Sequence, residues 1–292
     1  MICFENVTYA YPFSGSPAVR DINIRVRPGE LVLVSGQSGC GKTTLMRLAN
    51  GLCPGYFRGV MKGRVLIDGH DASSMTLGDV SRRVGTLFQD PEQQFFALGV
   101  EDELAFAHEW SGLPAEVTRE KVRHAAAAFG LSSALDKSIH ELSEGQKQKV
   151  GLASILSQEP RALVLDEPTA NLDPESTAEL ARRLRTLKES GMAVLVVDHR
   201  LYWLEGVADR VLVMKSGEIC AMGSFSLLED ESLRQSCGLR DCHVEDARAS
   251  LPDGETTAGG EKERGLRVKG LCFGYPGQAR LLTGRNCFSL PA

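Results

Sequence analysis

The hydrophobic pattern of the chain begins with two segments in which apolar and polar residues alternate. They run from Ile2 to Ala10 and from Val19 to Val26, and a turn rich in proline and glycine separates them. Alternation of this kind predicts strands with one buried face. A short apolar run from Leu31 to Val34 follows, as expected of a strand that is buried on both faces.

Buried strands and amphipathic helices then alternate along the chain. Further strands are predicted at Gly63–Asp68, Val84–Phe88, Arg161–Leu165 and Ala193–Val197, with a final hairpin of Val211–Met214 and Glu218–Met222. Helical spacing of apolar residues marks Val100–Trp110, Arg119–Phe129 and Pro174–Lys188. The pattern predicts an α/β fold with a mainly parallel sheet covered on both faces, and a helical subdomain inserted at about residues 90–157.

A glycine-rich stretch, GQSGCGKTT, lies between the strand at Leu31–Val34 and a helix-forming segment that starts at Leu45. It satisfies the pattern G-x-x-x-x-G-K-[ST], in which the backbone N–H groups curl around an anion and the following helix adds its dipole. Lys42 supplies a charge for the outer phosphates, and the Thr43 hydroxyl can ligate Mg²⁺. Residues 36–44 are therefore predicted to bind the phosphates of a nucleotide.

Composition narrows the class of protein. The chain has 292 residues, of which 42% are hydrophobic and 24% charged, as in ordinary globular proteins. A net charge of −5 argues against nucleic acid as the main partner. No apolar run approaches the roughly 18 residues of a membrane span, and the first residues do not resemble a signal peptide. Eight scattered cysteines favour reduced thiols, so we expect a cytosolic chain whose membrane role would need a partner.

Polar residues with metal-binding or proton-transfer chemistry stand at the ends of three other predicted strands. Asp166 can hold Mg²⁺ there, and the neighbouring Glu167 can polarise an attacking water. Gln89 can reach the metal and the same water. His199 follows the strand at Ala193–Val197 and can contact a γ-phosphate, although a lone histidine is more often structural.

Two further features fit a nucleotide. The segment LSEGQ from Leu142 to Gln146 opens a helix, so its free N–H groups and the Ser143 hydroxyl can bind a terminal phosphate. Tyr11 follows the first strand, where an aromatic ring can stack on a base or simply pack as a core residue.

Taken in order, these motifs resemble the nucleotide-binding domain of ATP-binding cassette (ABC) ATPases over about residues 1–223. The D-loop Asn171-Leu172-Asp173 completes the set. The resemblance implies a P-loop NTPase cassette with a RecA-like core, an antiparallel β subdomain and an inserted helical subdomain, within a domain at 1–230. It also implies ATP and Mg²⁺ as ligands, and two cassettes, identical or different, that sandwich two ATP molecules.

The resemblance assigns roles residue by residue. Nucleotide binding falls to Tyr11, Gly36, Gln37, Ser38, Gly39, Cys40, Gly41, Lys42, Thr43, Thr44, Ser143, Gly145 and Gln146. Metal binding falls to Thr43, Gln89 and Asp166, and catalysis to Glu167, His199 and Gln89. Two positions depart from the family pattern: Glu144 stands where glycine is usual, and Lys149 where arginine is usual. A carboxylate at position 144 should repel phosphate unless its side chain points away.

The subfamily is indicated by LFQDPEQQFF (Leu87–Phe96) and VEDELAF (Val100–Phe106), which look like the ATPases of energy-coupling factor transporters. That likeness implies import of a substrate with a transmembrane coupling protein and a substrate-binding membrane protein, at the cytoplasmic face of the membrane. Phe95 and Phe96 are then candidates for a docking surface, with core packing as the alternative. A soluble ABC ATPase outside transport and a non-hydrolysing remnant subunit are the other interpretations.

The tail repeats the start of the chain. Residues 231–264 are predicted to be a linker, because Asp241–Arg264 is polar and has a linker composition. A shift of 264 positions then aligns Tyr275-Pro276 with Tyr11-Pro12 and Leu266 with Ile2. Residues 265–292 are therefore predicted to be the truncated start of a second ABC domain.

Overall fold

The computed structural model describes residues 1–242, 265–268 and 288–291. The chain divides into two units, Met1–Val244 and Glu245–Ala292.

The first unit contains an antiparallel sheet built from the start of the chain. Its strands are β1 (Ile2–Ala10), β2 (Val19–Val26), β4 (Val60–Ile67) and β5 (His70–Asp71), in the order β2-β1-β4-β5. Buried and exposed side chains largely alternate along β2, as its sequence pattern predicts, whereas β1 begins with three consecutive buried residues, Ile2, Cys3 and Phe4.

A second sheet of six strands forms the centre of the unit. Its order is β10-β9-β3-β8-β7-β6, in which β10 is antiparallel to β9 and the other five strands are parallel. The strands are β3 (Leu31–Gly36), β6 (Val84–Leu87), β7 (Ala162–Asp166), β8 (Ala193–Val197), β9 (Arg210–Lys215) and β10 (Glu218–Gly223). Because the five strands are parallel, their carboxyl ends meet at one edge, where ligands of such sheets usually bind.

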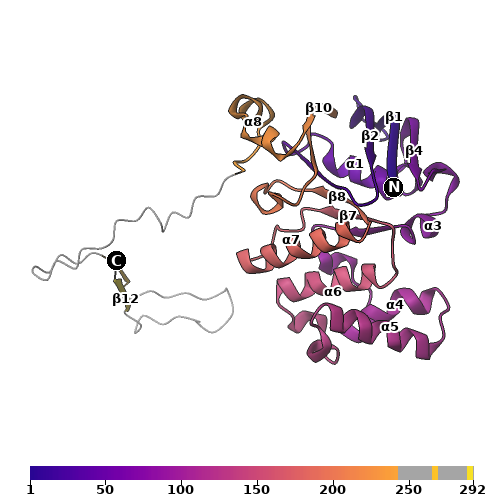
Figure 1. Ribbon diagram of the computed structural model, residues 1–292, viewed down its shortest axis with the longest axis vertical. Coiled ribbons are helices and arrows are strands. Elements are labelled where there is room, and N and C mark those ends of the chain that lie inside the picture. The colour runs from indigo at the N-terminus through magenta and orange to yellow at the C-terminus, as the bar shows by residue number, and fades with distance from the viewer. Residues whose placement is uncertain (243–264, 269–287, 292) are drawn as a thin grey trace, which may run out of the picture. The chain divides into compact units, whose positions relative to one another are not determined.

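The two faces of this sheet carry different layers (Figure 1). Along β3, Val32 and Val34 join a core shared with α1 (Lys42–Ala49) and the antiparallel sheet. Leu31 and Leu33 face the opposite core, which is shared with the helices that follow β6. Helix α1 and those helices therefore lie on opposite faces of the sheet.

The helical segment between β6 and β7 comprises α4 (Val100–Trp110), α5 (Ala115–Ala128) and α6 (Glu144–Leu156), and α7 (Pro174–Glu189) follows β7. Helix α6 approaches the end of β6 closely, since a Cβ added to Gly151 would lie 3.0 Å from a Leu87 methyl group. Shorter helices are α2 (Leu52–Gly55), α3 (Leu77–Ser81), η1 (Ala72–Ser74), η2 (Pro91–Gln94), η3 (Ser132–Ala134), η4 (Ile139–Glu141), η5 (Tyr202–Leu204) and η6 (Phe225–Glu229).

The end of the first unit differs from the predicted linker, which starts at residue 231. Residues Glu231–Cys237 form α8, and the unit continues to Val244. Asp230 caps α8 by accepting from two of its backbone N–H groups, and Cys237 and Cys242 are buried. The sequence does not predict this helix because it has few apolar residues to form a helical pattern, and one of them is a cysteine.

In the second unit, β11 (Gly265–Val268) pairs with β12 (Phe288–Pro291) as an antiparallel hairpin. Leu266 pairs with Leu290 and Val268 with Phe288. After subtraction of 264, these are the pairs Ile2–Val26 and Phe4–Ile24 of β1 and β2. The aligned Tyr275-Pro276 lies outside the described residues.

Candidate functional site

The glycine-rich loop joins β3 to α1 and is shaped by backbone that only glycine accommodates. Gly41 has φ +107°, and a Cβ there would lie 2.5 Å from the carbonyl oxygen of Ala18. A Cβ on Gly36 would lie 2.7 Å from Cys40 Sγ. No side chain in the described part of the chain caps the first turn of α1, so its N–H groups remain available to an anion.

Lys42 is folded onto this loop. Its ammonium donates to the carbonyl oxygens of Gly36 (2.8 Å) and Gln37 (3.0 Å), and the residue is 5% exposed. The predicted phosphate-binding cation therefore lies within the loop that would hold the phosphates. Ser38, Gly39 and Thr43 form the exposed side of the loop and the start of α1.

Tyr11 lies beside α1, so the structure brings this predicted residue to the nucleotide loop. Its hydroxyl accepts from Arg47 at 3.1 Å and lies 3.3 Å from the hydroxyl of Thr44. The ring packs edge-on against Tyr9, with 5.0 Å between centroids. Tyr11 thus has a packing role already, and base stacking by its partly exposed ring stays a prediction.

The three residues predicted to bind metal share an unusual property. Asp166 ends β7, Gln89 follows β6, and Thr43 lies in the first turn of the helix after β3, and none of their side chains makes a hydrogen bond to the described residues. Burial, together with the nearby Glu167 carboxylate, raises the pKa of Asp166 to about 6. A buried carboxylate, a hydroxyl and an amide oxygen that make no hydrogen bond within the described part of the chain are the kinds of group that ligate Mg²⁺.

Glu167 and His199 meet above the ends of β7 and β8. His199 Nε2 lies 3.1 Å from Glu167 Oε1. Burial and the nearby Lys42 ammonium lower the pKa of His199, so at neutral pH the ring that lies against the Glu167 carboxylate is uncharged. Glu167 has φ +44°, a conformation that is costly for a residue with a side chain and is often found at functional sites.

A buried carboxylate that the sequence interpretation missed holds this region together. Asp198 accepts from the Thr169 hydroxyl at 2.8 Å and from the Trp203 indole at 3.2 Å. It also accepts from the backbone N–H of Arg200, whose guanidinium donates to the carbonyl oxygens of Thr169 and Ala170. The network ties the segment after Glu167 to the segment that carries His199. Its only sequence signal is a charged residue at the end of a wholly apolar strand.

The predicted phosphate-binding turn before α6 lies apart from the loop. Ser143 and Gln146 form a capping box, in which the Ser143 hydroxyl accepts from Gln146 N–H and the Gln146 side chain accepts from Ser143 N–H. Gly145 packs against Ser176 of α7. Since α6 and α1 lie on opposite faces of the sheet, this turn does not complete the site formed by residues 36–44.

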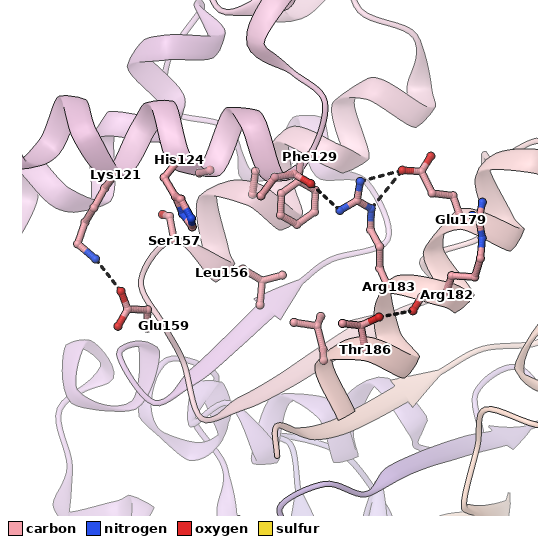
Figure 2. A pocket seen from close by; sticks show the side chains of 14 residues that line it. Lys121, His124, Phe129, Leu156, Ser157, Glu159, Glu179, Arg182, Arg183 and Thr186 are labelled. Atoms are coloured by element: carbon pink, nitrogen blue, oxygen red, sulfur yellow. Dashed lines mark hydrogen bonds and ion pairs between the residues drawn. The ribbon is translucent and has the colours of Figure 1, made fainter. Parts of the chain in front are cut away.

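A cavity of about 550 Å³ lies between α5, α6 and α7 (Figure 2). Phe129 and Leu156 contribute to its apolar wall, and Arg183 lies 4.4 Å from the centre of the Phe129 ring while it donates to Glu179. None of the residues that line it belongs to the predicted nucleotide site. The cavity therefore marks the junction of the helical segment with α7.

Comparison with known proteins decides the family. A family model described as ABC transporter matches residues 19–170, which is more than half of the chain. The chain belongs to the ABC transporter family. Its first unit is an ABC ATPase cassette, as the order of the motifs predicts.

Relatives and a solved structure agree with this assignment. An ABC transporter ATP-binding protein of Treponema denticola is 35% identical over 97% of this chain and 58% of its own length. One from Methanosarcina mazei is 42% identical over 80% of this chain and 84% of its own. CbiO1 from Clostridium perfringens, part of the ABC transporter complex CbiONQ, superposes with a TM-score of 0.70 at 31% identity over 82% of this chain and 94% of CbiO1. The chain thus spans little more than half of the Treponema protein, and the predicted cassette fold is confirmed.

Proposed function

We propose that this chain is the ATP-hydrolysing subunit that powers substrate import by an ABC transporter of the energy-coupling factor type. The observation that carries the proposal is the contact of Glu167 with His199, close in sequence to the buried Asp166, which makes no hydrogen bond to the described residues. The similarity to CbiO1 supports the subfamily.

The residues divide the reaction between them. The N–H groups of residues 36–44 and the Lys42 ammonium bind the phosphates, and Tyr11 contacts the base. A Mg²⁺ held by Thr43, Gln89 and Asp166 would neutralise charge on the β- and γ-phosphates. Glu167 orients and deprotonates the attacking water, while His199 holds the Glu167 carboxylate and contacts the γ-phosphate.

Two cassettes are needed for a complete site. The turn at Ser143–Gln146 has the exposed N-terminal end of α6 and lies on the other face of the sheet from α1. We therefore propose that it meets the nucleotide of a second cassette, identical or different. ATP binding would close the pair and hydrolysis would open it.

An exposed row of aromatic rings supports a membrane partner. Phe96 stacks on Phe106 with 4.6 Å between centroids, and Phe106 on Trp110 with 6.3 Å. Phe96 is 77% exposed and Trp110 is 85% exposed, whereas Phe95 packs into the core. Apolar surface of this kind marks interaction sites. No helix among the described residues is long and apolar enough to cross a membrane. We propose that this row docks a transmembrane coupling protein, which acts with a substrate-binding membrane component, at the cytoplasmic face.

The tail belongs to the same proposal. The pairing of β11 with β12 repeats that of β1 with β2 after the 264-residue shift. The match to the Treponema protein covers 97% of this chain and so extends into the tail. We infer that residues 265–292 begin a second cassette, joined through a linker.

The proposal is tested by purifying the tagged chain from native membranes. Phe96→Ser with Trp110→Ser removes the aromatic row, so recovery in the membrane fraction should fall at least about tenfold. Phe13→Ser is the matched control, because Phe13 is fully exposed on the β1–β2 turn and should leave recovery unchanged. An unsubstituted chain found only in the cytosol would favour a soluble ABC ATPase, and a membrane complex without ATP hydrolysis would favour a remnant subunit.

A further inference from the structure

The carboxylate that departs from the family pattern, Glu144, has a specific partner. Lys147, one turn further along α6, donates to Glu144 at 2.8 Å. The ammonium also pairs with Glu92 of η2, in the segment between Gln89 and Phe96. Although Lys147 lies on the first turns of a helix that meets solvent, its side chain is only 11% exposed.

Glu92 belongs to a segment that is fixed against α6. Gly151 allows the close approach, since a Cβ there would meet Leu87, Pro91 and Phe95 at 3.0–3.8 Å. The buried Glu103 carboxylate accepts from the backbone N–H groups of Phe96 and Ala97, both at 2.9 Å. Glu92 therefore presents its carboxylate to Lys147 from a well-anchored backbone.

The three charges form a closed group with one cation between two anions. Hydrogen bonds that the ammonium donates to Glu144 and Glu92 raise the pKa of Lys147, so the lysine stays protonated. Without Lys147, Glu144 would be an uncompensated negative charge next to Ser143 and Gly145, where an anionic phosphate is proposed to bind. The Lys147 ammonium thus neutralises the Glu144 carboxylate, which on the sequence alone is expected to repel phosphate.

We propose that Lys147 is a positioning residue that holds the Glu144 carboxylate away from the nucleotide of the second cassette, with Glu92 fixing the ammonium in place. This inference rests on the proposed function. It also links the segment that carries Phe96 to the phosphate-binding turn of α6, because Glu92 lies in that segment and pairs with the lysine that neutralises Glu144.

The test uses the complex recovered from native membranes with the tagged full-length chain, and measures kcat and KM for ATP. Lys147→Met should raise KM about tenfold, because like charges then oppose closure on ATP. Lys147→Arg should restore KM to within about twofold, since a guanidinium keeps the charge. Glu92→Gln should raise KM by a smaller factor, about threefold.

The suppressor variant separates this role from a merely structural one. Glu144→Gly combined with Lys147→Met should return KM to within about twofold of Glu144→Gly alone, because no carboxylate remains to be neutralised. Lys149→Met is the matched control: this lysine is two residues further along α6 and pairs with Glu179 at 2.7 Å, so KM should not change.

An unchanged KM in Lys147→Met, or a raised KM that Glu144→Gly does not correct, would overturn the inference while leaving the proposed function intact. Absence of hydrolysis by the unsubstituted complex would instead overturn the proposed function, and the inference with it.

Discussion

The cassette has two places proposed to meet phosphate, and they are built differently. The loop at residues 36–44 takes its shape from glycine backbone, and its cation, Lys42, bonds to carbonyl oxygens of the same loop. The turn at Ser143–Gln146 closes on itself through a capping box, and its charge balance depends on Glu92 from another segment. The loop is therefore a local structure, whereas the turn works only within its tertiary surroundings.

Lys42→Ala breaks the local site and should have the largest effect. Loss of a buried charge contact typically costs about 2–5 kcal/mol, so the Kd for ATP should rise at least about thirtyfold. Titration of the purified chain with a fluorescent ATP analogue measures this. Lys121→Ala, which removes a surface pair with Glu159, is the control. Equal affinity in Lys42→Ala and the unsubstituted chain would contradict the assignment of the loop.

Asp166→Asn tests, in the absence of nucleotide, how much the buried charge at the end of β7 affects the stability of the fold. The pKa of Asp166 is raised to about 6 from an ordinary 3.8, so the folded chain binds this proton more tightly than the unfolded chain. The protonated Asp166 carboxyl group therefore favours the folded chain fully below pH 4, and this contribution is lost as the pH rises to about 6. At pH 7 Asp166→Asn should therefore be more stable, by about 3 kcal/mol at most.

Denaturant unfolding of both chains at pH 4, 5, 6 and 7 measures that difference. The difference in unfolding free energy between the two chains should grow between pH 4 and pH 6 and stay constant above pH 6. A less stable Asp166→Asn chain at pH 7 would show that the carboxylate has a partner in the fold.

Ser143→Ala changes the turn at Ser143–Gln146 instead of the glycine-rich loop, and it should have the smallest effect on stability. It removes a helix cap, which costs about 1 kcal/mol of unfolding free energy. ATP binding by the isolated chain should not change, whereas hydrolysis by the complex should fall. Ser138→Ala removes the cap of a similar box in η4 and should lower stability without lowering hydrolysis. Equal loss of hydrolysis in both variants would mean that Ser143 acts only on the fold.

The sequence predicted most of the fold because its strands are apolar runs with clear ends. The boundaries of β1, β2, β8 and α4 coincide with the predicted ones. The loop at residues 36–44 was equally predictable, since its conformation depends on the closely spaced glycines Gly36, Gly39 and Gly41.

What the sequence could not predict are contacts between distant segments. Asp198 bonds to Thr169 and Trp203, and Lys147 to Glu92, and no local pattern encodes either pair. The phenylalanines illustrate the same limit: Phe95 packs into the core and Phe96 faces solvent, although they are neighbours with identical chemistry. Which face each takes depends on the backbone that Glu103 holds.

ATP hydrolysis by this cassette is proposed to depend on Glu167, which His199 contacts. The most direct test compares Glu167→Gln with the unsubstituted complex for ATP affinity and for hydrolysis at saturating Mg²⁺ and ATP. We expect the Glu167→Gln complex to bind ATP as tightly as the unsubstituted complex, or more tightly. Its kcat should be lower by about 10²–10⁴-fold, the usual contribution of a general base. Hydrolysis by Glu167→Gln at the unsubstituted rate would contradict this role of Glu167.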